Sequence, residues 1–417
     1  MDNIEVPEYF ICPISLQIMK DPVTTITGIT YDRDSIECWL SKNCNNRTIC
    51  PVTKVHVPRG SDLTPNHTLR RLIQAWCVMN GFNGVDLILS STPKPPLSKT
   101  YVLNLVLDLS VPRTEIKTLE RLEVLAKENE RNKMCMVEVG VHKALVKFLI
   151  QCYKKCDTNG LEKSLSTLSL IWGDNYKVEN REEILIDSIT WALGLDDHRD
   201  MQSHAAIKNH AVSLLRSIIQ KANSTTLERL KPQLFDTITG LLRQSYSTTT
   251  IIAQKGVNDA LHVMLDTSPS ARNRKMMIES RAIFELIELE INYFTSNKKT
   301  KELIFGILFN LCSCADGRAQ LLSHACGIAM ITKRILKVSP IVDEKGILIL
   351  CLISKYSSTS GVLQEFLKVK VVSKICTMIQ VDCPSYLKDQ AREILRCHFD
   401  VWKNSPCVEV ATLTRYA

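Results

Sequence analysis

Long apolar runs are absent from this 417-residue sequence, and so are long runs of like charge. The longest apolar stretch, residues 346–353, is far shorter than the roughly 18 residues that a membrane helix needs. The net charge of +8 is spread along the chain, which does not indicate a nucleic-acid partner. Residues 1–7 are acidic and lack an apolar core, so no signal or transit peptide is indicated. We therefore expect a soluble intracellular protein, in the cytoplasm or alternatively the nucleus, without integral membrane contact.

Common signatures of catalysis and cofactor binding are missing as well. The sequence has no glycine-rich phosphate loop, no His-Glu-x-x-His motif and no serine in a nucleophile elbow. Its 16 cysteines, in a reducing compartment, are expected to be thiols and mostly small buried hydrophobes. No cofactor is therefore indicated, and the chemistry must be sought in the domain organisation.

The composition changes along the chain and indicates two domains. Residues 7–80 are rich in Pro, Asp, Thr and Gly, whereas residues 101–405 have the 3.6-residue apolar period of successive helices. Between them, residues 90–98 contain three prolines, which disfavour helix and stiffen the chain. We predict an N-terminal domain at residues 5–82, a Pro/Ser-rich linker at 83–100 and a helical repeat domain at 101–417.

The helical region repeats itself. Residues 131–140 and 272–281 match in register and are 141 residues apart, which is three times 47. The same phase returns at residue 326 and at residue 370, after 45 and 44 residues. A helical period of about 40–47 residues, with a small residue between a short helix and a longer apolar one, is typical of armadillo and HEAT repeats. We predict an all-α superhelical solenoid of about six or seven repeats, whose extended surface binds another protein.

The N-terminal region is predicted to consist of short elements. A loop at residues 11–14 leads to a turn at 21–22, and the β-branched segment 23–27 forms a hairpin with 29–31 through Gly28. Asp32 is expected to cap a helix over residues 33–40. A second loop, residues 50–54, precedes an amphipathic helix over residues 68–79. The side chains assigned to the core are Tyr31, Ile36, Leu40, Leu69 and Ile73.

This order of elements invites comparison with zinc-binding RING domains, but the zinc ligands are missing. Tetrahedral zinc needs thiolates that are delivered in pairs from tight turns, usually as Cys-x2-Cys. No two cysteines of this region have that spacing, and the two histidines do not replace them: Cys12, Cys38, Cys44, Cys50, Cys77, His56 and His67. We expect no metal site. Asp32 and Asn66 are instead expected to hold the loops by hydrogen bonds.

The residues of the N-terminal region closely resemble the U-box family. The resemblance is carried by Phe10, Cys12-Pro13-Ile14, Met19, Asp21-Pro22-Val23, Gly28, Thr30-Tyr31-Asp32-Arg33, Ile36, Trp39-Leu40, Cys50-Pro51, Leu63, Pro65-Asn66, Leu69 and Ile73. With the armadillo array behind it, the whole chain resembles plant U-box proteins with armadillo repeats, including members involved in defence and stress signalling. The implied fold is an α+β U-box, a zinc-less RING-like domain, followed by an armadillo/HEAT-type solenoid.

The resemblance implies an E3 ubiquitin ligase. In U-box proteins an E2 enzyme carries ubiquitin as a thioester, and the E3 contributes no covalent nucleophile. The armadillo-like repeats would hold the substrate protein, and a negative regulatory role in plant defence or stress is implied by the resemblance alone. The implied E2-binding groove consists of Cys12, Pro13, Ile14, Trp39 and Pro51.

Lys54 occupies a further position of interest in the second loop. The U-box family often has an arginine there that bridges E2 and ubiquitin and favours the reactive state of the thioester. A lysine supplies a point charge in place of a bidentate fork, so the resemblance implies a weaker activation. The alternative is that Lys54 is simply a solvated loop residue.

Two rival interpretations stay open. Cys50 could accept ubiquitin itself as a thioester, which would need a partly exposed thiol beside a base. Alternatively, the chain is a non-catalytic armadillo adaptor or scaffold. A transport armadillo is not indicated, because Trp172 is followed by Asn175 in place of a Trp-x3-Asn pair and Trp191 has no such partner. Pairing of two copies into a homo-oligomer is also left open.

Overall fold

Two compact units make up the chain, residues 1–95 and residues 96–417, here named the N-terminal unit and the helical unit. The computed structural model describes residues 6–42, 49–57, 62–80, 97–172, 182–195, 201–246, 253–292 and 297–405. Most of the predicted linker lies outside the described residues. Its last two residues, 99 and 100, already belong to helix α3 (Lys99–Asp108).

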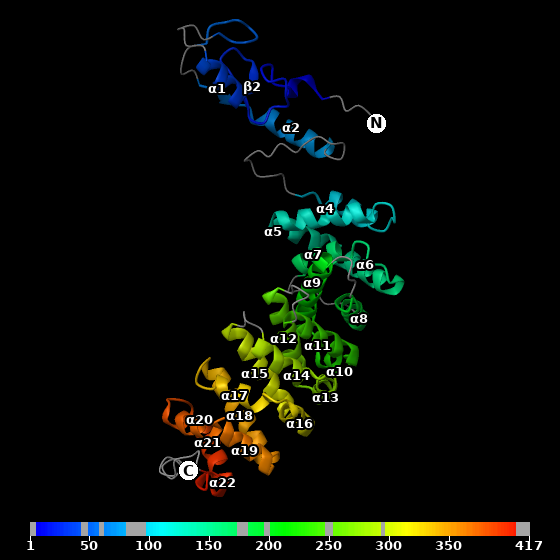
Figure 1. Ribbon diagram of the computed structural model, residues 1–417. Helices are drawn as coiled ribbons and strands as arrows, with labels where there is room; N and C mark the ends of the chain where they lie inside the picture. Colours follow the sequence, from blue (N-terminus) through cyan, green and yellow to red (C-terminus); the bar gives the residue numbers. More distant parts are fainter. Residues whose placement is uncertain are drawn as a thin grey trace. The chain divides into compact units, whose positions relative to one another are not determined.

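The N-terminal unit is a small α+β fold (Figure 1). Strand β1 (Pro22–Thr24) lies between β2 (Thr30–Asp32) and β3 (Thr64–Pro65), and both pairings are antiparallel. Gly28 forms the predicted turn between β1 and β2 with φ of +80°, a conformation that strains an L side chain. Helices α1 (Arg33–Lys42) and α2 (His67–Asn80) lie where the sequence predicts them, after a single helical turn η1 (Glu8–Phe10). The two-residue strand β3 was not predicted.

A small apolar core holds this unit together. Tyr31, Ile36 and Ile73 are almost completely buried, as predicted, while Leu40 and Leu69 pack partly buried against them. The remaining members of the buried cluster are Phe10, Cys12, Met19, Val23, Cys50, Val57 and Cys77. Three members of this small core are cysteines, and two of them, Cys12 and Cys50, also accept hydrogen bonds at sulfur.

Polar side chains connect the strands to the helices. Asp21 forms one ion pair with Arg33 Nε at 2.7 Å and another with Arg70 Nη1 at 3.3 Å. One carboxylate, directly before β1, is therefore joined to both helices. Asn66 caps α2, because its Oδ1 accepts the Leu69 N–H at 3.0 Å. The Asp32 carboxylate has another role than the predicted helix cap. Its Oδ1 accepts the backbone N–H groups of residues 20 and 21 and thereby holds the turn before β1.

The helical unit is built from repeats of a short first helix, a second helix and a long third helix, stacked in chain order (Figure 1). The third helices pack against one another in succession: α4 (Glu115–Glu128), α7 (Leu161–Ile171), α9 (Met201–Ile219), α12 (Gln254–Thr267), α15 (Lys298–Cys312), α18 (Pro340–Tyr356) and α21 (Ser385–Cys397). The second helices follow in chain order, and those from α6 to α17 contact one another in succession: α6 (Val141–Lys155), α8 (Glu182–Leu193), α11 (Pro232–Tyr246), α14 (Ala282–Asn292), α17 (Gly327–Arg334) and α20 (Val371–Gln380). The remaining short helices are α5 (Glu130–Val139), α10 (Ser224–Glu228), α13 (Ala271–Glu279), α16 (Ala315–Ser323), α19 (Ser360–Lys368) and α22 (Phe399–Lys403).

Side-chain hydrogen bonds between neighbouring repeats have the predicted spacing. Ser166 donates to Glu123 across 43 residues, Asn310 to Ser268 across 42, and the His398 ring meets the Ser354 carbonyl across 44. These separations match the period of about 40–47 residues expected for an armadillo-type array. None of the helices in the described part of the chain is long and apolar enough to cross a membrane.

The junction between the first and second helix of a repeat is defined by backbone conformation. The sequence predicts a small residue there, and Gly140 has φ of +88°. However, Arg281 and Lys370 adopt the same left-handed conformation at equivalent junctions, with φ of +63° and +61°, whereas Cys326 does not, at −108°. Three of the four junctions therefore share a left-handed residue, and a small residue stands at only two of the four, Gly140 and Cys326.

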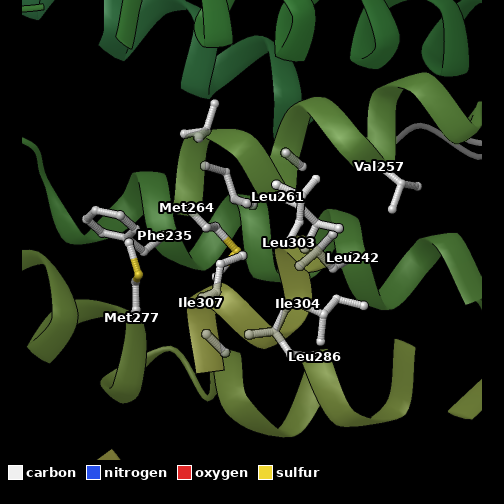
Figure 2. Packing of buried hydrophobic residues seen from close by; sticks show 14 of the residues in the cluster. Phe235, Leu242, Val257, Leu261, Met264, Met277, Leu286, Leu303, Ile304 and Ile307 are labelled. Carbon is white, nitrogen blue, oxygen red and sulfur yellow. The ribbon is translucent and has the colours of Figure 1, made fainter. Parts of the chain in front are cut away.

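One continuous apolar core runs through the helical unit. Figure 2 shows a section of it, where side chains of α11, α12, α13, α14 and α15 interdigitate. Phe235 and Leu242 of α11, Leu261 of α12, Leu286 of α14 and Ile304 of α15 are all essentially inaccessible to solvent. Because each repeat buries its apolar face only against its neighbours, the array is stabilised one interface at a time.

Candidate functional site

Two loops of the N-terminal unit have the same backbone hydrogen bonds. The first, residues 11–18, is closed by the bridge between Ile11 and Ile18, and the second, residues 49–56, by the bridge between Ile49 and His56. Both begin with the same three residue types, Ile-Cys-Pro. We name them loop 1 and loop 2.

Within each loop, the cysteine backbone makes both closing bonds. In loop 1, Cys12 N donates to Gln17 O at 2.8 Å and Leu16 N donates to Cys12 O at 2.9 Å. In loop 2, Cys50 N donates to Val55 O at 2.9 Å and Lys54 N donates to Cys50 O at 3.1 Å. The two loops are therefore copies of one turn.

The residue four positions after the cysteine has a left-handed backbone in each loop. Leu16 has φ of +55° and Lys54 has φ of +59°, in a region that non-glycine residues rarely adopt. Such strain persists only where the surroundings impose it, and it is found mainly at functional sites. Its recurrence at matched positions indicates that both loops are held in a specific shape.

The thiol of Cys12 holds loop 1 from inside. It is completely buried and its Sγ accepts the backbone N–H of Asp32 at 3.3 Å. Burial by itself raises the pKa of this thiol, but the N–H groups of Asp32, Ser15 and Ile14 and the Ser15 side chain outweigh it and lower the pKa below its ordinary value. Cys12 was predicted to contact the E2 enzyme. Because its side chain is buried, it supports the loop and cannot form part of the exposed surface in this conformation.

The thiol of Cys50 holds loop 2 in the same manner. Its Sγ lies 3.0 Å from the Tyr31 hydroxyl, and it accepts from the Thr27 hydroxyl at 3.4 Å and the Thr53 N–H at 3.5 Å. Burial acts to raise the pKa of Cys50, yet these donors lower it to about 6. Burial and the neighbouring Cys50 raise the pKa of the Tyr31 hydroxyl above its ordinary value, so the tyrosine remains a donor.

Strand β2 brings the two loops together. Cys12 bonds to the backbone of Asp32 and Cys50 bonds to the side chain of Tyr31, which is the preceding residue of the same strand. Within the described ranges of the chain, no three His, Cys, Asp or Glu side chains form a group that could hold a metal ion. The contacts that fix the loops are hydrogen bonds to sulfur and backbone.

Both loops present apolar side chains to solvent. In loop 1, Pro13 is exposed, Ile14 is partly buried against the core, and Leu16 is 78% exposed. In loop 2, Pro51 is partly exposed and Val52 is 49% exposed. Exposed apolar residues that gather on ordered loops indicate a binding surface.

The side chain of Trp39 lies beside loop 2. It belongs to α1, which begins directly after β2, and it is 38% exposed. Its Nε1 donates to the Ile49 carbonyl at 3.1 Å, so the indole is anchored at one edge. A tryptophan that is held by one hydrogen bond and half open to water has the properties of an interface anchor.

Lys54 is exposed at the end of loop 2. Its Nζ donates to the Pro51 carbonyl at 2.9 Å, so the ammonium group folds back over the loop. The side chain has no carboxylate partner among the ion pairs of the described residues. A cation is therefore available next to the apolar residues of loop 2.

Two exposed residues of this surface were missed in the sequence. Leu16 corresponds to Lys54 and Val52 corresponds to Ile14 when the loops are aligned as copies. The signal that could have identified them is the repeated sequence pattern Cys-Pro, β-branched apolar residue, Ser or Thr. In the structure, the residue that follows this pattern has a left-handed backbone in both loops.

Comparison with known proteins covers both units. The U-box domain model matches residues 6–81 and the plant U-box protein ARM repeat region matches residues 102–417. E3 ubiquitin-protein ligase PUB24 of Arabidopsis thaliana is 40% identical, over 99% of this chain and 96% of its own length. PUB23 and PUB22 of the same organism, also named E3 ubiquitin-protein ligases, are 36% and 35% identical, over 100% and 97% of this chain and 98% and 97% of their own lengths. The chain is therefore similar to these relatives over both of its units.

Proposed function

Because the chain belongs to the plant U-box proteins with an ARM repeat region, we propose that it acts as an E3 ubiquitin-protein ligase. The N-terminal unit binds a ubiquitin-charged E2 enzyme, and the helical unit holds the substrate protein. The observation that carries the proposal is the pair of matched loops, which offer Ile14, Leu16, Pro51 and Val52, with Trp39 beside loop 2.

The proposed contribution to catalysis is positional. The E2 brings its ubiquitin as a thioester, and a substrate lysine attacks the thioester carbon while the E2 thiolate leaves. The E3 raises the rate by holding the E2 and the substrate lysine at a productive distance, which requires no acid or base from this chain. Apolar anchors of such an interface cost on the order of 1–4 kcal/mol each when truncated.

Lys54 is proposed to contribute a second effect. Its ammonium group donates to the Pro51 carbonyl, and rotation about its long side chain would let it reach an acceptor on a bound E2 or ubiquitin. One charge-assisted hydrogen bond across that junction would favour the closed arrangement of the thioester. Lys54→Arg, which adds a bidentate fork, is then expected to increase transfer, and Lys54→Ala to decrease it.

Burial of Cys50 argues against a covalent ubiquitin intermediate on this residue. Its thiol is 1% exposed and is occupied by Tyr31, Thr27 and Thr53, so a thioester carbonyl has no path to it. A lowered pKa alone does not make a nucleophile when access is lacking. The proposal therefore keeps the transfer directly from E2 to substrate.

A negative regulatory role in plant defence and stress signalling, in the cytoplasm, is part of the proposal. It rests on the resemblance to plant U-box proteins alone. Association of two copies is an additional hypothesis, for which size-exclusion chromatography with light scattering is the direct measurement.

An in-vitro ubiquitination assay tests the function. Wild type is incubated with E1, ATP, ubiquitin and a panel of E2 enzymes, and compared with Ile14→Ala, Leu16→Ala and Pro51→Ala. Leu72→Ala is the matched control, because Leu72 is also apolar and 52% exposed but belongs to α2 and to neither loop. Circular dichroism confirms that each variant is folded.

The expected result is polyubiquitin chains with wild type and Leu72→Ala, and a loss of about tenfold or more with each loop variant. If folded loop variants were as active as wild type, the proposed E2 surface would be wrong. If wild type were inactive with every E2, the non-catalytic adaptor would become the better interpretation.

A further inference from the structure

Cys50 fixes the backbone on which the Lys54 side chain stands. Its Sγ accepts the Thr53 N–H at 3.5 Å, and its backbone carbonyl accepts the Lys54 N–H at 3.1 Å. One residue therefore holds two consecutive N–H groups, the second of which belongs to Lys54 with its left-handed φ of +59°. A strained backbone persists only where its surroundings impose it, so the position of Cys50 determines where the Lys54 side chain begins.

The Tyr31 hydroxyl in turn holds the Cys50 sulfur. The oxygen lies 3.0 Å from Sγ, closer than the Thr27 hydroxyl at 3.4 Å and the Thr53 N–H at 3.5 Å. Tyr31 belongs to β2 and its side chain is completely buried, so its hydroxyl is a fixed point. A series of contacts thus leads from strand β2 through sulfur to the backbone of the exposed Lys54.

The charge on the sulfur strengthens this series of contacts. Burial acts to raise the pKa of Cys50, but its hydrogen-bond donors lower it to about 6. Burial and the neighbouring Cys50 raise the pKa of the Tyr31 hydroxyl. At neutral pH the sulfur is therefore ionised and accepts, while the tyrosine donates. A hydrogen bond to an ionised acceptor is roughly twice as strong as one between neutral groups.

Loop 1 shows that the turn itself does not require the tyrosine. There, Cys12 Sγ accepts the backbone N–H of Asp32 at 3.3 Å, and the residue that matches Lys54 is the apolar Leu16. Both loops nevertheless have the same closing bonds and the same left-handed residue. The hydroxyl-to-sulfur contact is therefore an addition found in the loop that carries the cation.

We propose that Tyr31 and Cys50 are positioning residues of the transfer reaction, which hold loop 2 so that Lys54 is directed toward the junction of a bound E2 and its ubiquitin. This role rests on the function proposed above and extends the contribution of Lys54. Both positioning residues are buried, so they act through Lys54 and not on the reacting atoms. They restrict the directions that the ammonium group can take, and so raise the fraction of complexes in a productive geometry.

A positioning role and a purely structural role predict different couplings to Lys54. A residue that only stabilises the core lowers activity by the same factor whatever residue stands at position 54. A residue that acts through Lys54 has no further influence once the ammonium group is removed. A double-mutant cycle of Tyr31 and Lys54 distinguishes these two cases.

The test measures the discharge of a purified ubiquitin-charged E2 onto free lysine in a single turnover, with the full chain present at saturating concentration. Tyr31→Phe keeps the buried ring and removes only the hydroxyl. It is expected to lower the maximum rate about tenfold, as is Lys54→Ala. The double variant is expected to be no slower than Lys54→Ala alone. Tyr9→Phe removes a hydroxyl from an exposed tyrosine of the same unit and is the control, expected to match wild type.

Substitutions of Cys50 supply a rescue experiment. Cys50→Ala removes the acceptor and is expected to lower the maximum rate as Tyr31→Phe does. Cys50→Asp offers an ionised acceptor to the same donors and is expected to recover most of the rate. Circular dichroism checks that each variant is folded. If Tyr31→Phe does not fold, Cys50→Ala and Lys54→Ala form an equivalent cycle, and if the Cys50 variants do not fold, the Tyr31 cycle still decides.

Three results would overturn the positioning role while leaving the ligase function intact. These are a double variant as slow as the product of the two single effects, full activity of Tyr31→Phe, and full activity of Lys54→Ala. In each of them wild type still discharges the E2. If wild type failed to discharge any E2, the proposed function itself would be wrong, and the positioning role with it.

Discussion

In the N-terminal unit single polar groups hold the structure, whereas in the helical unit one arrangement of apolar side chains recurs from repeat to repeat. Asp21, Asp32, Cys12 and Cys50 each connect segments that are separated along the chain. In the array, the loss of one contact leaves the interfaces on either side intact. We therefore expect a polar substitution to destabilise the whole N-terminal unit, and an apolar substitution to destabilise mainly its own repeat in the helical unit.

The largest effect is expected from a cavity in the array. Ile287→Ala on α14 removes a completely buried side chain and should cost about 3 kcal/mol of stability. Hydrogen exchange of the full chain should show faster exchange around α14 and its neighbours and none in the N-terminal unit. Ile291→Ala, at a 45% exposed position on the same helix, should have little effect. Loss of protection throughout both units would contradict the repeat-by-repeat interpretation.

A somewhat smaller effect is expected at the ion pairs of the small unit. Asp21→Asn weakens the contacts to both Arg33 and Arg70 and should cost about 2 kcal/mol, because two cations lose one shared partner. Limited proteolysis should then cut the N-terminal unit while the helical unit resists. The control is Glu37→Gln, which loses only an exposed pair at 3.6 Å with Arg33. If both variants resisted proteolysis equally, Asp21 would not have the connecting role described above.

The Cys50 thiol makes the stability of the small unit dependent on pH. Its pKa in the folded protein is lowered from 9.0 to about 6, so the thiolate stabilises the folded state fully above pH 9, and this stabilisation is lost as pH falls to 6. At pH 7 it should amount to about 1 kcal/mol. Urea unfolding of the N-terminal unit, followed between pH 9 and 6, should show this slope in wild type and a flatter one in Cys50→Ala.

Cys77→Ala is the matched control for this measurement. Burial raises the pKa of the Cys77 thiol, so it stays protonated over the same range and cannot produce the slope. A slope that persists in Cys50→Ala and disappears in Cys77→Ala would be the reverse of the expectation.

The smallest effect on stability is expected from substitution of Asp266, and it is a gain in place of a loss. Burial raises the pKa of this carboxyl, so its ionised form destabilises the folded helical unit at neutral pH, and the penalty disappears as pH falls through the folded pKa. Asp266→Asn should therefore raise the stability slightly at pH 7 and by less in acid. Chemical unfolding at the two pH values measures the difference, with Asp236→Asn as the control. A destabilised Asp266→Asn would mean that the carboxylate has a partner in the folded protein.

The sequence was sufficient to predict most elements of the small unit. Turn residues such as Gly28 and the amphipathic pattern from Thr68 onward act locally, so hairpin and helices lie where expected. The ion pairs of Asp21 could not be predicted, because Arg33 and Arg70 are distant along the chain and become neighbours only when both helices dock. Strand β3 was missed for a different reason, since a two-residue strand has no periodicity to detect.

The predicted contacts of the candidate site with an E2 enzyme stay a prediction. Pro13, Ile14, Trp39 and Pro51 do lie on the surface around the two loops, whereas Cys12 is buried. Residue type cannot distinguish a loop side chain that points to solvent from one that points to the core, because this depends on the left-handed turn that follows.

The sequence by itself determined the order of the elements, the period of the array and the two Cys-Pro loops, all of which depend on neighbours within about one turn or on a repeated spacing. Only the tertiary structure decided that Leu16 faces water while Cys12 bonds to Asp32, 20 residues away. It also decided that Arg216 pairs with Asp259, 43 residues away, while Asp266 Oδ2 has no hydrogen-bond partner among the described residues. Which polar group is paired depends on packing between distant segments, and local sequence does not contain that information.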